Sequence, residues 1–218
     1  MADEIRTVPS TLPAAIPAAI ADPAPLGLAA FALTTFLLSA ANANWMTAAT
    51  GNAWLGYALA YGGVCQLLAG MWEFRNRNVF GATAFSTYGG FWIGLFLWVQ
   101  FVAPHAASAT QADHDLGWIL LAFAIFNTYM LLMSTQVNIA VFTVFLTLEI
   151  TEVILFIGNF AGNTSIVHIG GYLGVITALA AWYTSAAGVS NGIAGSRIKL
   201  PVGPPLLAPG PVPATVGA

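Results

Sequence analysis

Charged side chains are scarce in this sequence. Lys and Arg together number 5 and Asp and Glu number 8, so charged residues make up 6% of the 218 residues, against about 25% in a soluble globular domain. So few charges cannot cover a water-facing surface, and disordered chains are charge-rich as well. Five basic residues and a net charge of -3 also provide no phosphate-binding surface, which excludes nucleic acid as a partner.

Cysteine is almost absent, and the sequence lacks the common catalytic motifs. The single Cys65 excludes a disulfide framework and a cysteine metal cluster. The three histidines are scattered, and no P-loop, Ser-His-Asp or HExxH pattern is present. We therefore expect no metal, no cofactor and no enzymatic activity.

Hydrophobic residues, in contrast, make up 58% of the chain, and the mean hydropathy is +0.81. A membrane-spanning helix needs about 20 mostly apolar residues. Six stretches meet this requirement, at residues 26–43, 54–74, 80–103, 116–135, 138–157 and 165–188. The sequence therefore predicts an all-α, polytopic membrane protein in which six transmembrane helices form one bundle. The first stretch follows a net-acidic arm, so we do not expect it to be a signal peptide.

The two ends of the chain differ in composition from the body. Residues 1–21 are rich in Pro and Ala, and residues 200–218 contain six prolines. Such segments are typical of flexible or polyproline-like chain outside the bilayer. We therefore predict a flexible N-terminal arm (1–21), one transmembrane domain (22–199) and a flexible, Pro-rich C-terminal tail (200–218).

The basic residues predict the orientation in the membrane. With six spans, all five lie on one side, in the N-terminal arm, the second loop and the C-terminal segment, namely Arg6, Arg75, Arg77, Arg197 and Lys199. The third loop, on the opposite side, holds His105, Asp113, His114 and Asp115. Basic loops stay on the cytoplasmic side, so we expect a multi-pass protein of the plasma (inner) membrane with both termini in the cytoplasm.

Glycines occur in pairs one helical turn apart, at Gly90 and Gly94, at Gly158 and Gly162, and at Gly170 and Gly174. Small residues at this spacing let helices approach closely in lipid. The pairs fit tight packing within one bundle, and they also fit contacts between subunits of a homo-oligomer.

Polar residues inside the predicted spans are costly unless they are paired or face water. Together they indicate a polar path and favour a transporter or channel over an enzyme; they are Asn42, Gln66, Ser86, Thr87, Tyr88, Asn127, Glu149, Glu152 and His168.

Three segments carry a family resemblance. They are DPAPLGL at residues 22–28, the pair FGATAF at 80–85 and YGGFW at 88–92, and GNFAGN at 158–163 followed by His168, Gly170 and Gly171. With these motifs the sequence closely resembles the acetate uptake transporter family over about residues 22–185. The resemblance implies a six-helix fold assembled as a hexamer. Each protomer would then hold a pathway for acetate and, in some members, succinate or other short carboxylates, acting as a proton-coupled permease or an anion channel.

The resemblance also implies a narrow point formed by Phe31, Tyr88 and Leu148. Candidate substrate-binding residues come from the motifs, from helix ends with free N–H groups and from nearby polar positions. They are Asp22, Pro25, Leu26, Gly27, Thr34, Thr87, Asn159, Asn163 and His168. Thr35, next to Thr34 and one turn beyond Phe31, is expected to line the same path. Without the family resemblance, the prolines and asparagines are interpreted only as residues that cap helices.

The chain departs from the family pattern at two places. Asp22 stands where the family motif begins with Asn, and an ionised Asp cannot donate hydrogen bonds to a carboxylate. Glu149 and Glu152 stand where the enteric relatives are apolar. Their i, i+3 spacing places them on one helical face, and two carboxyls in a low-dielectric site are not expected to ionise together. They form a protonation-sensitive pair that gates passage, or they bind neighbouring helices or face an aqueous vestibule.

The leading hypothesis is passage of acetate and related short carboxylates across the lipid bilayer. Two alternatives remain open from the sequence. One is a channel of the same fold for another small solute such as ammonium. The other is a membrane scaffold or sensor whose tails recruit partners.

Overall fold

The computed structural model describes residues 20–46, 52–207 and 210, and it is helical almost throughout. The elements in chain order are α1 (Ala24–Asn42), α2 (Leu55–Tyr57), the π-helix η1 (Ala58–Cys65), α3 (Gln66–Arg75), α4 (Val79–Leu97), the π-helix η2 (Trp98–Val102), the 3-10 helix η3 (Ala103–His105), α5 (Ala109–Ser134), α6 (Ile139–Phe160) and α7 (Thr164–Gly192). The predicted N-terminal arm lies outside the described residues up to position 19.

Short polar side chains start the long helices. The side chains of Asn78, Ser108, Asn138 and Asn163 accept a backbone N–H in the first turns of α4, α5, α6 and α7. Such caps satisfy N–H groups that have no partner inside the helix. Helix α1 instead has Pro25 in its first turn, where a missing N–H costs nothing.

Within the part of the chain that the structure describes, five helices are long and apolar enough to cross a membrane, namely Ala24–Asn42, Val79–His105, Ala109–Ser134, Ile139–Phe160 and Thr164–Gly192. They coincide with five of the six predicted spans. The remaining one, at residues 54–74, is the continuous run of α2, η1 and α3, which is not among the five. Helix α5 begins seven residues earlier than predicted because its capped first turns are polar, so Asp113, His114 and Asp115 lie in the helix and not in a loop.

Several polar side chains are buried within the largely apolar interior of this bundle, and apolar side chains cover its surface. The largest fully buried side chains are Gln66, Glu73, Asn127, Thr34, Thr177 and Ser134. Large hydrophobic side chains such as Ile125 (63% exposed) and Leu132 (60%) lie on the outside. In a soluble protein, polar and charged residues take most of the exposed positions. The outward apolar surface is suited to lipid.

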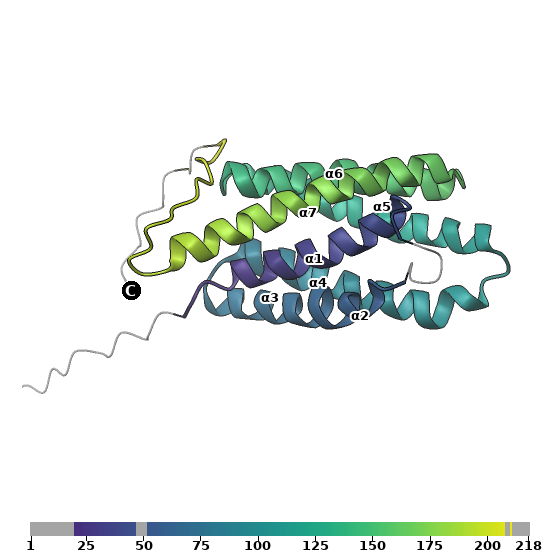
Figure 1. The fold of residues 1–218 in the computed structure, drawn as a ribbon, viewed down its shortest axis with the longest axis horizontal. Coiled ribbons are helices and arrows are strands. Elements are labelled where there is room, and N and C mark those ends of the chain that lie inside the picture. Colours follow the sequence, from purple (N-terminus) through teal and green to yellow (C-terminus); the bar gives the residue numbers. More distant parts are fainter. Residues whose placement is uncertain (1–19, 47–51, 208–209, 211–218) are drawn as a thin grey trace, which may run out of the picture.

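Helix α1 lies between α7 on one side and α3 and α4 on the other, and α6 packs along α7 (Figure 1). Glycines make these contacts close. A Cβ on Gly27 would lie 2.7 Å from the Phe85 ring of α4, and one on Gly174 would collide with Ser39 of α1. Gly170 likewise faces Leu155, whereas Gly90 and Gly94 face open space. The pair at 170 and 174 therefore packs within the chain, and the pair at 90 and 94 does not.

Hydrogen bonds to the helices hold residues 200–207, the segment that follows α7. The backbone N–H groups of Leu206 and Leu207 both donate to the carbonyl of Thr135, at 2.8 and 3.0 Å, and Ala140 donates to the carbonyl of Val202 at 2.9 Å. The Tyr183 hydroxyl donates to the carbonyl of Pro201 at 2.6 Å. These bonds hold the segment, here called the strap, across the ends of α5, α6 and α7 (Figure 1). Its prolines prevent a helix but leave these carbonyls free to accept.

Candidate functional site

A large cavity opens at the end of the bundle where α1 begins and α7 ends. It has a volume of about 510 Å³ and is here called the vestibule. Its wall combines the start of α1, the α3–α4 and α5–α6 turns, the end of α7 and Val202 of the strap. Four asparagines lie in this wall, at positions 76, 78, 138 and 191. The four basic residues in the described part of the chain flank the same end, at positions 75, 77, 197 and 199.

Two small cavities continue from the vestibule into the bundle. The inner cavity, about 30 Å³, shares Leu28, Ala84, Phe85 and Phe145 with the vestibule wall. The outer cavity, about 40 Å³, lies beyond it and is lined by residues of α1, α4, α5 and α6. The three spaces therefore follow one another from one end of the bundle into its middle.

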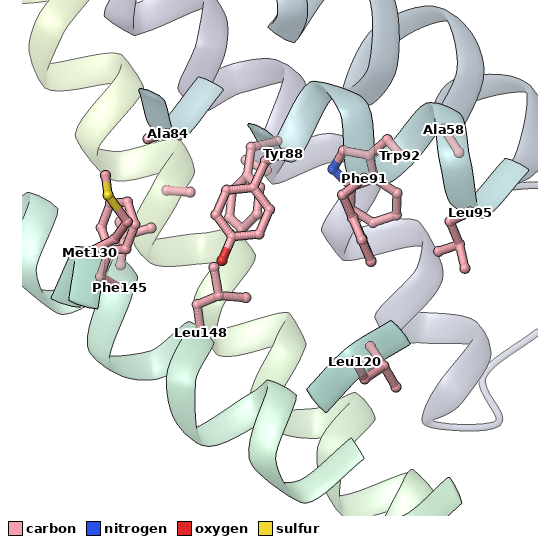
Figure 2. Close-up of a cluster of buried hydrophobic side chains, with 14 of the residues drawn as sticks. Ala58, Ala84, Tyr88, Phe91, Trp92, Leu95, Leu120, Met130, Phe145 and Leu148 are labelled. Carbon is pink, nitrogen blue, oxygen red and sulfur yellow. The ribbon is translucent and has the colours of Figure 1, made fainter. Parts of the chain in front are cut away.

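Phe31, Tyr88 and Leu148 line both small cavities and separate them. All three are buried, with exposed fractions of 5%, 4% and 6%. The rings of Phe31 and Tyr88 meet edge to face, with centroids 5.7 Å apart. Figure 2 shows the hydroxyl end of Tyr88 directed toward Leu148 of α6. The three side chains that the family resemblance names thus come together from three helices.

The Tyr88 hydroxyl belongs to a buried hydrogen-bond network with α5 and α6. It lies 3.0 Å from Oδ1 of Asn127 and 3.3 Å from Oε1 of Glu152. The Asn127 amide nitrogen donates to the carbonyl of Phe145 at 3.0 Å and to Glu149 at 2.8 Å. The other oxygen of Glu149 accepts from Thr128 at 2.8 Å. Glu149 and Glu152 are therefore joined through Asn127 and Tyr88, and not directly to each other.

The residues of the first motif occupy different surroundings. Asp22 and Pro25 line the vestibule. The Asp22 carboxylate accepts from the backbone N–H of Ala24 at 3.0 Å, so it binds the start of its own helix. Gly27 is required by the contact with Phe85. Leu26 is 47% exposed and lines a second, more open hollow at α1 and α7, which adjoins the vestibule at Asp22 and Pro25.

Thr34 and Thr87 do not line the vestibule or either small cavity. The hydroxyl of Thr34 lies 3.4 Å from the carbonyl of Tyr57, and its side chain packs where Gly62 leaves room. Thr35 lines the outer cavity in its place. Successive residues of a helix point about 100° apart, so a shift of one position moves the side chain to another face.

The residues near the start of α7 serve the helix ends. Asn163 caps α7, and its carbonyl oxygen accepts from Ser165 and Ile166. The amide of Asn159 donates to the carbonyl of Leu155 in its own helix. His168 is half-buried in the first turns of α7. The side chains of both asparagines therefore bind helix backbone, as the interpretation without the family resemblance expects.

Sequence reasoning did not single out Asn127, Trp92 or the strap. The signal for Trp92 was its spacing, because it follows Tyr88 by four residues and residues at this spacing lie on one helical face. Asn127 was visible only as one polar residue among several. The strap is held largely by backbone hydrogen bonds, which leave no pattern of side chains in the sequence that could have predicted them.

Comparison with known proteins supports the family. A model of the GPR1/FUN34/yaaH family matches residues 6–204. The chain belongs to this family. The resemblance to acetate uptake transporters is thereby confirmed. One relative is "Acetate permease A" of Emericella nidulans, which is 40% identical over 185 residues. The match covers 78% of this chain and 62% of that protein.

A bacterial member of the GPR1/FUN34/yaaH family matches over nearly its whole length. The "Succinate-acetate/proton symporter SatP" of Escherichia coli is 35% identical over 184 residues, which cover 84% of this chain and 96% of that protein. A solved structure, "Structure of the bacterial acetate channel SatP", superposes with a TM-score of 0.78 at 33% identity, covering 85% of this chain and 100% of that one. The fold is therefore that of the solved family member, and the chain is an integral membrane protein.

Fungal members are longer. The "Ammonia transport outward protein 2" of Saccharomyces cerevisiae is 38% identical over 175 residues, which cover 78% of this chain and 62% of that protein. The chain spans less than two thirds of the length of these fungal relatives.

Proposed function

We propose that this protein passes acetate and similar short carboxylates across a membrane through the vestibule, the inner cavity and the outer cavity of each protomer. One observation carries the proposal. Phe31, Tyr88 and Leu148 stand between two cavities that lie in line with the vestibule. The trio is then the narrow point of the path, and the relatives named as acetate transporters and channels supply the substrate class.

The size of the cavities fits a small solute. Cavities of about 30 and 40 Å³ each hold on the order of two or three waters. Acetate has four non-hydrogen atoms, which is comparable. Succinate has twice as many, so its passage requires side chains of the trio to move.

The chemistry of the path favours weak binding and rapid release. The described spans contain no Lys or Arg facing either small cavity. Neutral amides and hydroxyls replace part of the water around an anion without the strong attraction of a full positive charge. The four vestibule asparagines offer such groups at the entrance.

The proposal includes the membrane topology. The run of α2, η1 and α3 covers residues 55–75, which is long enough for a sixth span. The basic residues gather at the vestibule end, so this end faces the cytoplasm by the positive-inside rule. Both ends of the membrane domain are then cytoplasmic.

The proposal also includes a hexamer. Gly90 and Gly94 form an open, small-residue face on α4, and such faces let helices of neighbouring subunits approach closely. Native mass spectrometry in mild detergent should show six copies. Replacing both glycines by Leu should reduce the assembly while the monomer stays helical. A parent protein that is monomeric throughout would overturn this part.

Uptake by liposomes that contain only this protein tests the function. Labelled acetate should enter, and unlabelled acetate should compete with it. One relative is named for ammonia transport, so labelled methylammonium is tested in the same vesicles. Entry of methylammonium without acetate would favour the second candidate, a channel for ammonia or ammonium. Entry of neither would contradict both.

A further inference from the structure

Three buried polar atoms without a hydrogen-bond partner belong to residues that line the outer cavity. Among the described residues, Thr35 Oγ1, Trp92 Nε1 and Glu152 Oε2 have no partner. Their side chains are 6%, 2% and 4% exposed and come from α1, α4 and α6. Buried polar groups are nearly always hydrogen-bonded. Three such atoms around one space of about 40 Å³ indicate that the space is built to receive a polar molecule.

The donor set specifies the chemistry of that molecule. The Trp92 indole can only donate a hydrogen bond, and the Thr35 hydroxyl can donate one. The wall also has apolar side chains, among them Leu38, Leu120 and Leu155, beside the polar Ser39, Asn42 and Thr151. Two donors beside an apolar surface match a group with two acceptor oxygens and a short hydrocarbon part. A small monocarboxylate has this shape.

The network around Tyr88 determines the proton on Glu152. The Asn127 nitrogen uses both hydrogens, one on the Phe145 carbonyl and one on Glu149. Because a carbonyl can only accept, the amide cannot be turned around. Asn127 Oδ1 therefore needs the single hydroxyl hydrogen of Tyr88, 3.0 Å away. An ionised Glu152 would then have no donor on either oxygen.

Glu152 avoids this situation as a carboxylic acid. Its proton can lie on Oε1 and donate to the Tyr88 oxygen at 3.3 Å, or on Oε2 and donate to a molecule in the outer cavity. If Tyr88 donated to an ionised Glu152 instead, Asn127 Oδ1 would lose its donor and Glu152 Oε2 would still have none. A buried charge without a hydrogen-bond donor costs far more free energy than a buried carbonyl without one, so the protonated Glu152 is favoured.

Neighbouring groups agree with this assignment. Glu152 faces Glu149 one turn away on its own helix and Tyr88 of α4, and α1 contains no titratable side chain. On α7, Tyr172 stacks on Trp45 and Tyr183 binds the strap, and His168 lies in its first turns. Glu149 differs from Glu152, since Asn127 donates to one of its oxygens and the other lies 2.8 Å from the Thr128 hydroxyl, which also lies 2.9 Å from the carbonyl of Ala124.

We propose that the outer cavity binds one small monocarboxylate, which shares the carboxylic proton of Glu152 and accepts further hydrogen bonds from Trp92 and Thr35. This inference rests on the proposed function and adds the site at which the carboxylate pauses. The site takes the anion together with one proton already held by the protein. Its volume of about 40 Å³ suits a carboxylate of two or three carbons.

Infrared difference spectroscopy tests the shared proton directly, with 13C-labelled acetate added to the detergent-solubilised protein. Acetate should shift the C=O band of a protonated carboxylic acid, and Glu152→Gln should remove that band change. Glu149→Gln is the matched control and should keep it. No acid band change in the parent, or the same change in Glu152→Gln, overturns the proposal. This measurement does not depend on transport. If liposomes take up acetate but acetate leaves the C=O band of the carboxylic acid unchanged, the proposed function stands and only the binding site is contradicted.

Equilibrium binding of labelled acetate tests the two other donors. Trp92→Phe and Thr35→Val each remove one donor to a charged group and should weaken binding about tenfold or more. Trp118→Phe is the matched control, because Trp118 is 58% exposed on the outer surface, and it should bind as the parent does. Circular dichroism establishes that the variants are folded. Folded Trp92→Phe and Thr35→Val proteins with parental affinity would contradict the assigned site.

Discussion

The inner and outer cavities lie on opposite sides of the same three side chains, yet their walls differ in chemistry. Apart from Tyr88, the inner cavity has Gln66 as its one polar side chain and is otherwise lined by aliphatic and phenyl groups. The outer cavity has Thr35, Ser39, Asn42, Thr151 and Glu152 as well as the Trp92 indole. A carboxylate is therefore expected to cross the inner cavity quickly and to stay longer in the outer one. The solute is therefore expected to be selected by size at Phe31, Tyr88 and Leu148, and by hydrogen bonding in the outer cavity.

The largest effect is expected from closing the inner cavity. Ala84 is 3% exposed and lines both this cavity and the vestibule, so Ala84→Leu places a branched side chain in the path. Acetate uptake by liposomes should fall more than about tenfold, at a stability cost of roughly 1–3 kcal/mol from overpacking. Acetate binding from the outer side should persist. Unchanged uptake by folded Ala84→Leu would show that solute does not use this cavity.

The next largest effect is expected from joining the two cavities. Tyr88→Ala removes the ring between them and should raise succinate uptake relative to acetate by roughly tenfold or more. Truncating a buried aromatic should also cost about 3–5 kcal/mol of unfolding free energy. Phe31→Ala should act in the same direction. Tyr88→Phe keeps the ring and serves as the control; a similar rise in succinate uptake there would argue against selection by size.

A loss of stability is expected at Asn127. Asn127→Leu leaves the Tyr88 hydroxyl and the Glu149 carboxyl without their amide partner. Each stranded buried group costs about 1–3 kcal/mol, so the unfolding free energy should fall by about 2–4 kcal/mol. The thermal unfolding midpoint in detergent measures this. An unshifted midpoint would mean that water replaces the amide.

The smallest effect is expected far from both cavities, at the strap. Tyr183→Phe removes one hydrogen bond, to the carbonyl of Pro201, and should cost about 0.5–1.5 kcal/mol. Proteolysis between residues 199 and 207 should become faster, while the acetate affinity stays as in the parent. A changed acetate affinity would link the strap to the binding site.

Much of this arrangement could be predicted from the sequence. Hydropathy located five of the spans to within a few residues, apart from the polar start of α5. The family resemblance implied the three residues between the cavities. The face of α1 could not be predicted, because this helix is apolar on nearly every side. Thr34 and Thr35 are then indistinguishable until α1 is packed against its neighbours.

Longer-range contacts explain the other differences. Tyr88 and Glu152 are 64 positions apart, and their contact depends on how α4 packs near α6. Glu149 and Glu152 look alike in sequence, but their opposite surroundings come from Asn127 on a third helix. The strap is held by backbone carbonyls and N–H groups, which every residue type possesses, so its composition indicated only that it is not a helix.

The strap has a consequence for how the protein is made. It follows α7 in the chain, and it contacts Thr135 and Ala140 at the turn between α5 and α6. During translation, these acceptors and donors are in the membrane before the strap leaves the ribosome. The vestibule wall at Val202 is therefore completed only after all the described helices have been synthesised. A nascent chain whose strap has not yet left the ribosome lacks this part of the vestibule wall.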